Sequence, residues 1–155
     1  MFSHFFVMTG PPRGIREVIL PASLAYAQQV LASQPFSALL GAQPTVYSED
    51  LVEIRLAIVD QLKQQYGFVH GGVLSFLADN TLTFAGGLRL SGQIVTAEYK
   101  INYLRPALGT ELIARGQVLS AGSSQAVTRC ELYMVLDGTE RLCAAAQGTI
   151  TVRRG

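Results

Sequence analysis

The spacing of apolar residues changes from a helical to a strand-like period near residue 43. Upstream of that point, Ser23 precedes a run in which Leu24, Ala27, Val30 and Leu31 fall on one face of a helix. Serine is a common helix N-cap, and a residue that precedes proline is biased away from the helical conformation. The sequence therefore predicts a helix that begins after Ser23 and ends before the next proline.

The flanks of this helix are irregular or short. Residues 1–22 contain Gly10-Pro11-Pro12 and Pro21, which predicts an irregular N-terminal arm. Residues 36–40 are expected to form one short helical turn that Gly41 ends. No repeat or linker divides the rest of the chain, and the chain length of 155 residues suits one core. We expect residues 23–155 to form a single domain.

A long helix and several strands are predicted after residue 43. A polar loop over residues 61–69 leads into a segment from about His70 to Leu88 that lacks proline and repeats its apolar positions with helical spacing. Alternating apolar and polar residues predict strands at 52–58, 95–103, 112–119, 125–136 and 142–152. A sheet that curls around the buried helix would satisfy both patterns, which predicts an α+β domain.

The strand pattern makes three specific predictions. Strict alternation in the strand over residues 95–103 places Tyr99 on one face and Thr96 on the other. The same rule places Glu53 on the polar face of a half-buried strand. Asp137-Gly138 between the last two strands is a strong signal for a tight hairpin turn.

The composition is poor in charge. Charged residues make up 15% of the chain, below the usual figure of about 25%, whereas hydrophobic residues make up 49%. The longest uncharged run contains several prolines and glutamines, so it is not a membrane-spanning helix, which needs about 20 mostly apolar residues. The first residues lack the basic region of a signal peptide. We expect a cytoplasmic protein that buries apolar surface against copies of itself.

Two classes of partner are disfavoured by the residues present. There are 12 Lys and Arg against 11 Asp and Glu, without a basic face, which argues against nucleic acid. Cys130 and Cys143 form no CxxC pair, and with only His4 and His70 available the usual zinc spacings cannot be built. We therefore predict no metal site, and we expect both cysteines to be packing residues.

The candidate chemistry lies in the long helix. Over residues 64–88 the only charged side chain is Asp79, and burying a carboxylate is costly unless it is compensated. Gly72, Ser75 and Thr83 share its helical face, which is small and polar enough to accept a ligand or another backbone. The alternative is structural: Asp79 bonds Thr83 or nearby backbone and only specifies packing.

A second feature stands at the start of the same helix. Two glycines in His70-Gly71-Gly72 leave the backbone N–H groups of the first turn bare and approachable, as in an anion or oxyanion site. The glycines could instead serve a tight turn or close packing, and His70 could be an N-cap or a core residue rather than a catalyst. Together with Asp79, these donors suit acyl transfer, in which they polarise a carbonyl that a carboxylate attacks directly or through water.

Several segments in order resemble one known family. They are Gly67-Phe68-Val69-His70-Gly71-Gly72, Leu77-Ala78-Asp79, Thr96-Ala97-Glu98 and Asn102-Tyr103-Leu104-Arg105-Pro106-Ala107. They resemble the hotdog-fold thioesterases of the phenylacetate-degradation type over about residues 36–152. The resemblance implies a hotdog fold, in which an antiparallel sheet wraps a long central helix at about 70–88, here with an extra N-terminal helix. It also implies hydrolysis of an acyl-CoA thioester in a site shared by two subunits.

The resemblance also implies roles for particular residues. Asp79 matches the catalytic carboxylate, as nucleophile or general base, and Gly71 matches the N–H donor that polarises the carbonyl, with His70 and Gly72 completing that turn. Gln64 stands where many members carry Asn, and Gln is found there in related 4-hydroxybenzoyl-CoA thioesterases, as is a Thr at the position of Thr83. The remaining matches line the site or hold the CoA moiety: Thr96, Arg105, Ser123 and Ser124. For Arg105 a surface salt bridge is an equal alternative.

The resemblance implies no cofactor beyond the CoA of the substrate, and it implies dimers that pair into tetramers. A non-enzymatic acyl-CoA-binding module of the same fold is the alternative function. A hotdog dehydratase or hydratase is a third, but His70 and Asp79 are nine residues apart and lie on opposite faces of the helix. The acyl group is not determined; medium-chain, long-chain and aryl groups all suit the aromatic residues near the motif.

Overall fold

The computed structural model describes residues 23–153, so the arm predicted over residues 1–22 lies outside the described residues. The strands are β1 (Gln43–Tyr47), β2 (Val52–Ala57), β3 (Ile94–Tyr103), β4 (Glu111–Ala121), β5 (Gln125–Leu136) and β6 (Thr139–Val152). The helices are α1 (Leu24–Ala32), α2 (Pro35–Leu40) and α3 (Gly71–Gly87), with a 3₁₀ turn at Asp60–Leu62. All strands pair antiparallel in one sheet of order β1-β2-β4-β5-β6-β3.

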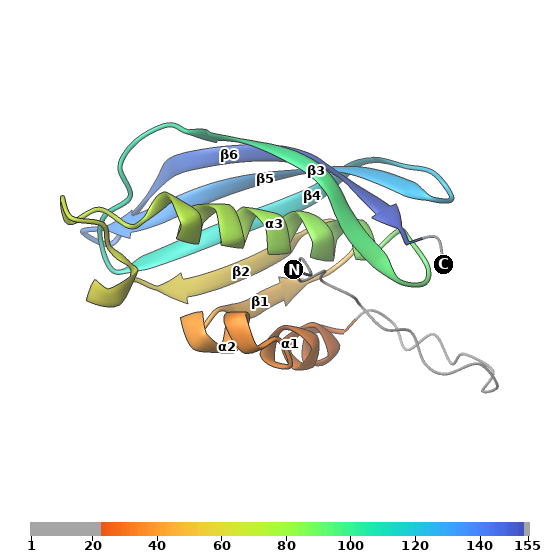
Figure 1. Cartoon of the computed structure of the whole chain (residues 1–155), viewed down its shortest axis with the longest axis horizontal. Helices are drawn as coiled ribbons and strands as arrows, with labels where there is room; N and C mark the ends of the chain where they lie inside the picture. The colour runs from red at the N-terminus through yellow and green to blue at the C-terminus, as the bar shows by residue number, and fades with distance from the viewer. Residues whose placement is uncertain (1–22, 154–155) are drawn as a thin grey trace, which may run out of the picture.

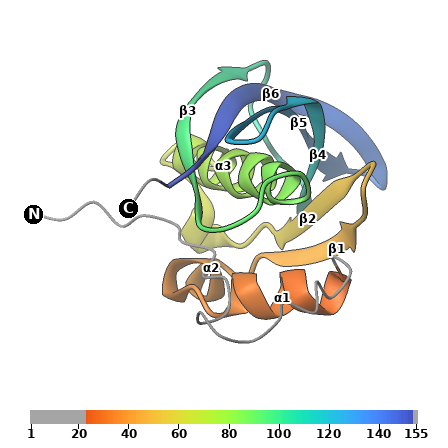
Figure 2. The same cartoon turned by 90° about the vertical axis from the view of Figure 1, so that its right-hand side faces the viewer.

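The sheet curves around α3, as Figures 1 and 2 show from two sides. Helix α3 has no Pro and a single charged residue, and Leu77, Leu82 and Phe84 along it are fully buried. The inward residues of β2, β4, β5 and β6 complete this core, because one face of each strand points at the helix. The predicted α+β class and hotdog arrangement are confirmed, with two strands before α3 and four after it.

The predicted N-terminal helices are confirmed together with the residues that delimit them. The side chain of Ser23 accepts a hydrogen bond from the Tyr26 N–H at 3.2 Å, as an N-cap does. Gly41 ends α2 at φ +77°, a left-handed conformation that glycine adopts without strain. Helix α1 packs against β1, and α2 reaches α3 through an edge-to-face contact of the Phe36 and Phe76 rings, 5.3 Å between centroids.

The hairpin between β5 and β6 is also confirmed. Asp137 and Gly138 both have positive φ, 52° and 72°, as a type I′ turn requires. Within the described residues, no helix combines the length and apolar character needed to cross a membrane.

Strand β3 departs from the alternation that its sequence predicts. Its pairing with β6 shifts register between Thr96 and Glu98, which leaves Ala97 as the extra residue of a β-bulge. Because of the bulge, Thr96 and Tyr99 both face α3, where the former bonds Asp79 and the latter Ser75. The prediction that Thr96 and Tyr99 lie on opposite faces is therefore wrong.

Gly148 on β6 makes room for this bulge. A Cβ atom built on Gly148 would lie 2.6 Å from the carbonyl oxygen of Glu98 and 2.6 Å from Cβ of Tyr99. Contacts that close do not occur with a real side chain, so glycine is required where the bulged backbone passes over β6. A glycine on the neighbouring strand thus permits the bulge that turns Thr96 toward α3.

Glu53 is buried rather than exposed on a polar face. Only 7% of the Glu53 side chain is exposed to solvent. Its carboxylate accepts hydrogen bonds from Arg55, Arg115 and Thr45, each at 2.8 Å. Burial alone would raise the pKa of Glu53, but these three donors outweigh burial and hold the pKa below its ordinary value. The alternating pattern predicts correctly that Glu53 lies on the face of β2 away from α3. The side chains of Arg55 and Arg115 cover its carboxylate on that face.

Candidate active site

The Asp79 carboxylate lies between α3 and β3, where a threonine from each element contributes to its environment. The Thr96 hydroxyl donates to Asp79 Oδ1 at 2.7 Å, and Thr83 Oγ1 lies 2.6 Å from Thr96 Oγ1. A hydroxyl has one proton, and that of Thr96 is given to the carboxylate, so Thr83 is the donor in the second bond. The two threonines form a chain of hydrogen bonds that ends on Oδ1.

The other oxygen of Asp79 is available. Among the residues that the structure describes, none donates a hydrogen bond to Oδ2, and the side chain is only partly exposed. Burial raises the pKa of Asp79 above its ordinary value, and the hydrogen bond from Thr96 opposes part of that rise. The Thr96 hydroxyl therefore holds Oδ1, whereas Oδ2 receives no hydrogen bond from the described residues. The carboxylate as a whole is more basic than one in water.

The start of α3 differs from the expectation of two bare N–H groups. His70 is the N-cap of α3, and its Nδ1 atom accepts the Gly72 N–H at 2.9 Å. The expectation is therefore wrong for Gly72, whose N–H is occupied, and the N-cap alternative for His70 is confirmed. A side chain at position 72 would place Cβ 3.0 Å from Nδ1, which explains the glycine there.

The Gly71 N–H remains available. Gly71 is the first residue of α3, and nothing in the described part of the chain accepts a hydrogen bond from its N–H. Such a group at a helix N-terminus favours a developing negative charge. Gln64 lies in the loop just before α3, where its Oε1 atom accepts the Tyr66 N–H at 2.7 Å, so this part of its amide supports the loop.

Gly71 and Asp79 lie too far apart to act on one atom within a single chain. They are separated by eight residues of one helix, which is about 12 Å along its axis. A reacting carbonyl has to lie about 3 Å from both its nucleophile and its oxyanion donor. Within one chain, Gly71 and Asp79 are therefore two separate candidate groups, here called half-sites, on the partly exposed side of α3.

The remaining expected site residues lie elsewhere. Arg105 follows β3 and is exposed, and its guanidinium forms no ion pair or hydrogen bond with the described residues, which disfavours the salt-bridge alternative. Ser123 and Ser124 lie in the exposed turn between β4 and β5. The structure does not bring these three residues to Asp79 within one chain.

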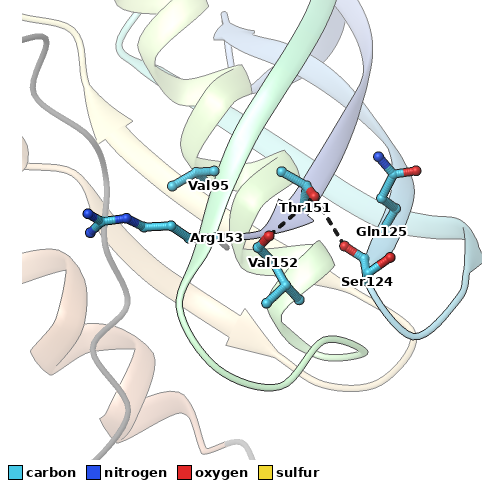
Figure 3. Close-up of a pocket in the computed structure, with 6 residues that line it drawn as sticks. All are labelled: Val95, Ser124, Gln125, Thr151, Val152 and Arg153. Atoms are coloured by element: carbon cyan, nitrogen blue, oxygen red, sulfur yellow. Dashed lines mark hydrogen bonds between the residues drawn. The ribbon is translucent and has the colours of Figure 1, made fainter. Parts of the chain in front are cut away.

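Ser124 instead borders a pocket of about 460 Å³. Figure 3 shows its lining: Val95, Ser124, Gln125, Thr151, Val152 and Arg153. The Thr151 hydroxyl donates to the Ser124 carbonyl oxygen at 3.2 Å across this pocket. Val95 and Thr151 are paired residues of β3 and β6, so the pocket lies where these two strands approach the turn between β4 and β5.

Two tyrosines of β3 contact α3. Tyr99 is one of the aromatic residues expected near the acyl group, whereas Tyr103 was not among the site residues that the sequence indicated. The Tyr99 hydroxyl lies 2.5 Å from the Ser75 hydroxyl, and the Tyr103 hydroxyl donates to the Gly71 carbonyl oxygen at 3.1 Å. Their place on one face of β3 was visible in the sequence, but their position along α3 depends on strand register. Within the described residues there is no group of three or more His, Cys, Asp or Glu side chains that could hold a metal ion.

Comparison with known proteins shows what the whole chain is similar to. The family model described as "Thioesterase superfamily" matches residues 66–140, a range that includes Gly71 and Asp79. The 1,4-dihydroxy-2-naphthoyl-CoA hydrolase of Escherichia coli (strain K12) is 27% identical over 106 residues, 67% of this chain and 76% of that protein.

Two solved structures extend the likeness over most of the chain. A thioesterase family protein from Silicibacter pomeroyi superposes with a TM-score of 0.75 at 27% identity, covering 86% of this chain and all of that one. The PaaI protein of the E. coli phenylacetic acid degradation operon superposes with a TM-score of 0.70 at 23% identity, covering 86% and 98%. The second likeness is one of fold alone.

Proposed function

We infer that the chain is a thioester hydrolase of the thioesterase superfamily, and from this premise we propose that it hydrolyses an acyl-CoA to the free acid and CoA. The observation that carries the proposal is the Asp79 carboxylate, which is held by Thr96 at one oxygen and left open at the other. A group of this kind is positioned and basic enough to attack a thioester or to activate water.

Both roles of Asp79 lead to the same products. As nucleophile, Oδ2 attacks the carbonyl carbon, the C–S bond breaks, CoA leaves as thiolate, and water then hydrolyses the mixed anhydride. As general base, Oδ2 takes a proton from water while the water oxygen attacks the same carbon; the C–S bond breaks and the thiolate takes up the proton. In either case negative charge develops on the carbonyl oxygen, which the Gly71 N–H stabilises.

We assign Gly71 and Asp79 of one site to different subunits, because about 12 Å of helix separates them within one chain. A two-fold axis beside α3 would bring Gly71 of one copy to Asp79 of the other and would create two identical sites. Strand β3 supports this arrangement, since among the described strands it ends the sheet and pairs with β6 alone. Its unpaired edge is available to a second copy. Pairing of dimers into tetramers stays a prediction.

The CoA moiety is assigned to the polar groups outside these half-sites. Arg105 is a cation without a described partner, which suits a phosphate of CoA. The pocket beside Ser124 is also lined by Arg153, which suits another polar part of the same substrate, and Ser123 precedes Ser124 in the same exposed turn. For the acyl group, Phe76 lies three residues before Asp79 on α3, and this proximity suits medium-chain, long-chain or aryl groups.

A cytoplasmic location and the absence of a cofactor stay predictions.

The direct test is a panel of acyl-CoA esters with short, medium, long and aromatic acyl groups, assayed by trapping the released thiol. We expect turnover of at least one ester without any added metal or cofactor. Saturable binding of the esters with no CoA release would instead favour the acyl-CoA-binding module and overturn the proposed reaction.

Replacement of Thr96 by valine is expected to move the pH dependence of the reaction. The carboxylate form of Asp79 is the active one, so kcat/KM rises as pH increases through the pKa of Asp79 in the free enzyme. The Thr96 hydrogen bond lowers that pKa, and its loss raises it, so the acidic limb of the profile shifts to higher pH. The measurement is kcat/KM of both proteins over a range of about pH 4 to 8, which spans the titration of a carboxylate with a raised pKa.

Thr149→Val is the matched control. The Thr149 hydroxyl donates to Glu98 at 2.6 Å on the face of the sheet away from α3. Its pH profile should overlay that of the wild type. A Thr96→Val profile with an unmoved or more acidic limb would contradict the role of Thr96.

A further inference from the structure

One peptide group at the start of α3 is held at both of its polar ends. The N–H of the peptide between Gly71 and Gly72 is donated to Nδ1 of His70 at 2.9 Å. The C=O of the same peptide accepts the hydroxyl of Tyr103, at the end of β3, at 3.1 Å. The two partners are 33 residues apart in sequence and belong to different elements.

This peptide needs external support because it lies between two glycines. Glycine samples backbone conformations that other residues cannot reach, so the plane of such a peptide is weakly defined by its own chain. The bond from Gly72 to the His70 side chain closes a ring of atoms that passes through the Gly71 nitrogen. Fixing the Gly71–Gly72 peptide therefore also fixes the direction of the Gly71 N–H.

The side chain of Tyr103 fits the glycine that it supports. A Cβ atom on Gly71 would lie 3.5 Å from Cζ and from the hydroxyl oxygen of Tyr103, which is ordinary van der Waals contact. The tyrosine ring thus lies directly against the first residue of α3. Tyr103 is itself 54% exposed, so little of the core depends on its burial.

We propose that Tyr103 is a positioning residue, whose hydroxyl holds the Gly71–Gly72 peptide so that the Gly71 N–H points at the thioester carbonyl oxygen. This inference rests on the proposed function, in which Gly71 supplies the oxyanion donor. Tyr103 does not touch the reacting atoms, and it acts through the peptide whose carbonyl it binds. Its contribution is greatest when charge develops on the substrate oxygen, so it affects kcat more than KM.

The test is Tyr103→Phe, which removes the hydroxyl and keeps the ring against Gly71. Loss of one hydrogen bond to this peptide should lower kcat by about 3- to 10-fold. KM for the same acyl-CoA should stay within about 2-fold, because ground-state binding does not use the bond. Tyr133→Phe is the matched control: its hydroxyl bonds Glu131 on the face of the sheet away from α3, and kcat should not change.

A second readout does not depend on turnover. Amide hydrogen exchange at Gly72, followed by NMR of the ¹⁵N-labelled protein, reports opening of the His70 cap. We expect faster exchange at Gly72 in Tyr103→Phe and no change in Tyr133→Phe. A wild type that hydrolyses no acyl-CoA would overturn the proposed function, whereas an active enzyme with an equal kcat in Tyr103→Phe, or an unchanged Gly72 exchange rate, overturns the positioning role.

Discussion

Replacement of Asp79 by asparagine is expected to abolish hydrolysis of every acyl-CoA, lowering kcat by about 10³-fold or more. Asparagine has the same shape and still accepts the Thr96 hydroxyl at Oδ1, but it can neither attack the thioester nor take a proton from water. The measurement is the initial rate of CoA release with the best ester of the panel. A rate equal to that of the wild type would exclude the proposed mechanism.

The same variant should be more stable than the wild type. Burial raises the folded-state pKa of Asp79, so between the unfolded and folded pKa values the native protein holds the extra proton, and stability falls as pH rises through that interval. At pH 7 the ionised carboxylate is thus a cost that asparagine removes. We expect a gain on the order of 1 kcal/mol, or about 2–4 °C in Tm.

Thermal unfolding of the wild type and of Asp79→Asn at pH 7 shows whether a loss of activity comes from the missing carboxylate or from a less stable fold. An inactive variant with a lowered Tm would indicate that Asp79 is a packing residue, the structural alternative that its sequence leaves open. Asp79→Ala serves as a second variant, because it cannot regain a carboxylate by deamidation.

Replacement of Gly71 by proline is expected to lower kcat by about 10²–10³-fold, the usual cost of one oxyanion-hole donor. Proline removes the N–H and leaves the rest of the backbone in place. Position 71 is the first residue of α3, where proline is favoured, and His70 is extended at φ −61°, ψ 134°, as a residue before proline prefers. The measurement is kcat with the same ester, together with Tm.

Gly71→Ala is the matched control, since alanine adds a side chain but keeps the N–H. Its Cβ would meet the Tyr103 ring at 3.5 Å, a distance that needs no rearrangement. The alanine variant should retain most of the activity. Equal rates for the proline and alanine variants would show that the Gly71 N–H is not the oxyanion donor.

The two inactive variants together test whether a site is shared between subunits. In a mixed dimer of Asp79→Asn and Gly71→Pro chains, one site would combine an intact Gly71 from one chain with an intact Asp79 from the other. Random mixing of equal amounts should then restore about a quarter of the wild-type activity, because about half of the dimers are mixed and each has one intact site. No recovery in a demonstrably mixed sample would place both groups of a site in one chain.

The elements around the site follow from local sequence. Helix α3 could be predicted because its apolar residues repeat with helical spacing over a segment without proline, and the β5–β6 turn because Asp137-Gly138 tolerates positive φ. Asp79 could be singled out because a lone carboxylate in a buried helix is costly. Each of these inferences uses only residues close together in the chain.

The partners of the site could not be predicted in the same way. The bulge at Ala97 adds one residue to β3 and turns Thr96 toward Asp79, although the alternating pattern on each side of it looks regular. The signal for the bulge is Gly148, on another strand, and only the pairing of β3 with β6 connects the two. The contact of Tyr103 with Gly71 depends on the same register.

The sequence by itself determined the long helix, the strands, the turn glycines and the lone carboxylate of that helix, because periodicity and residue chemistry act over a few neighbours. Only the tertiary structure decided which N–H is free and which hydroxyls reach Asp79. The physical reason is that a hydrogen bond depends on distances of a few tenths of an ångström, and strand register, bulges and caps set those distances between residues far apart in the chain.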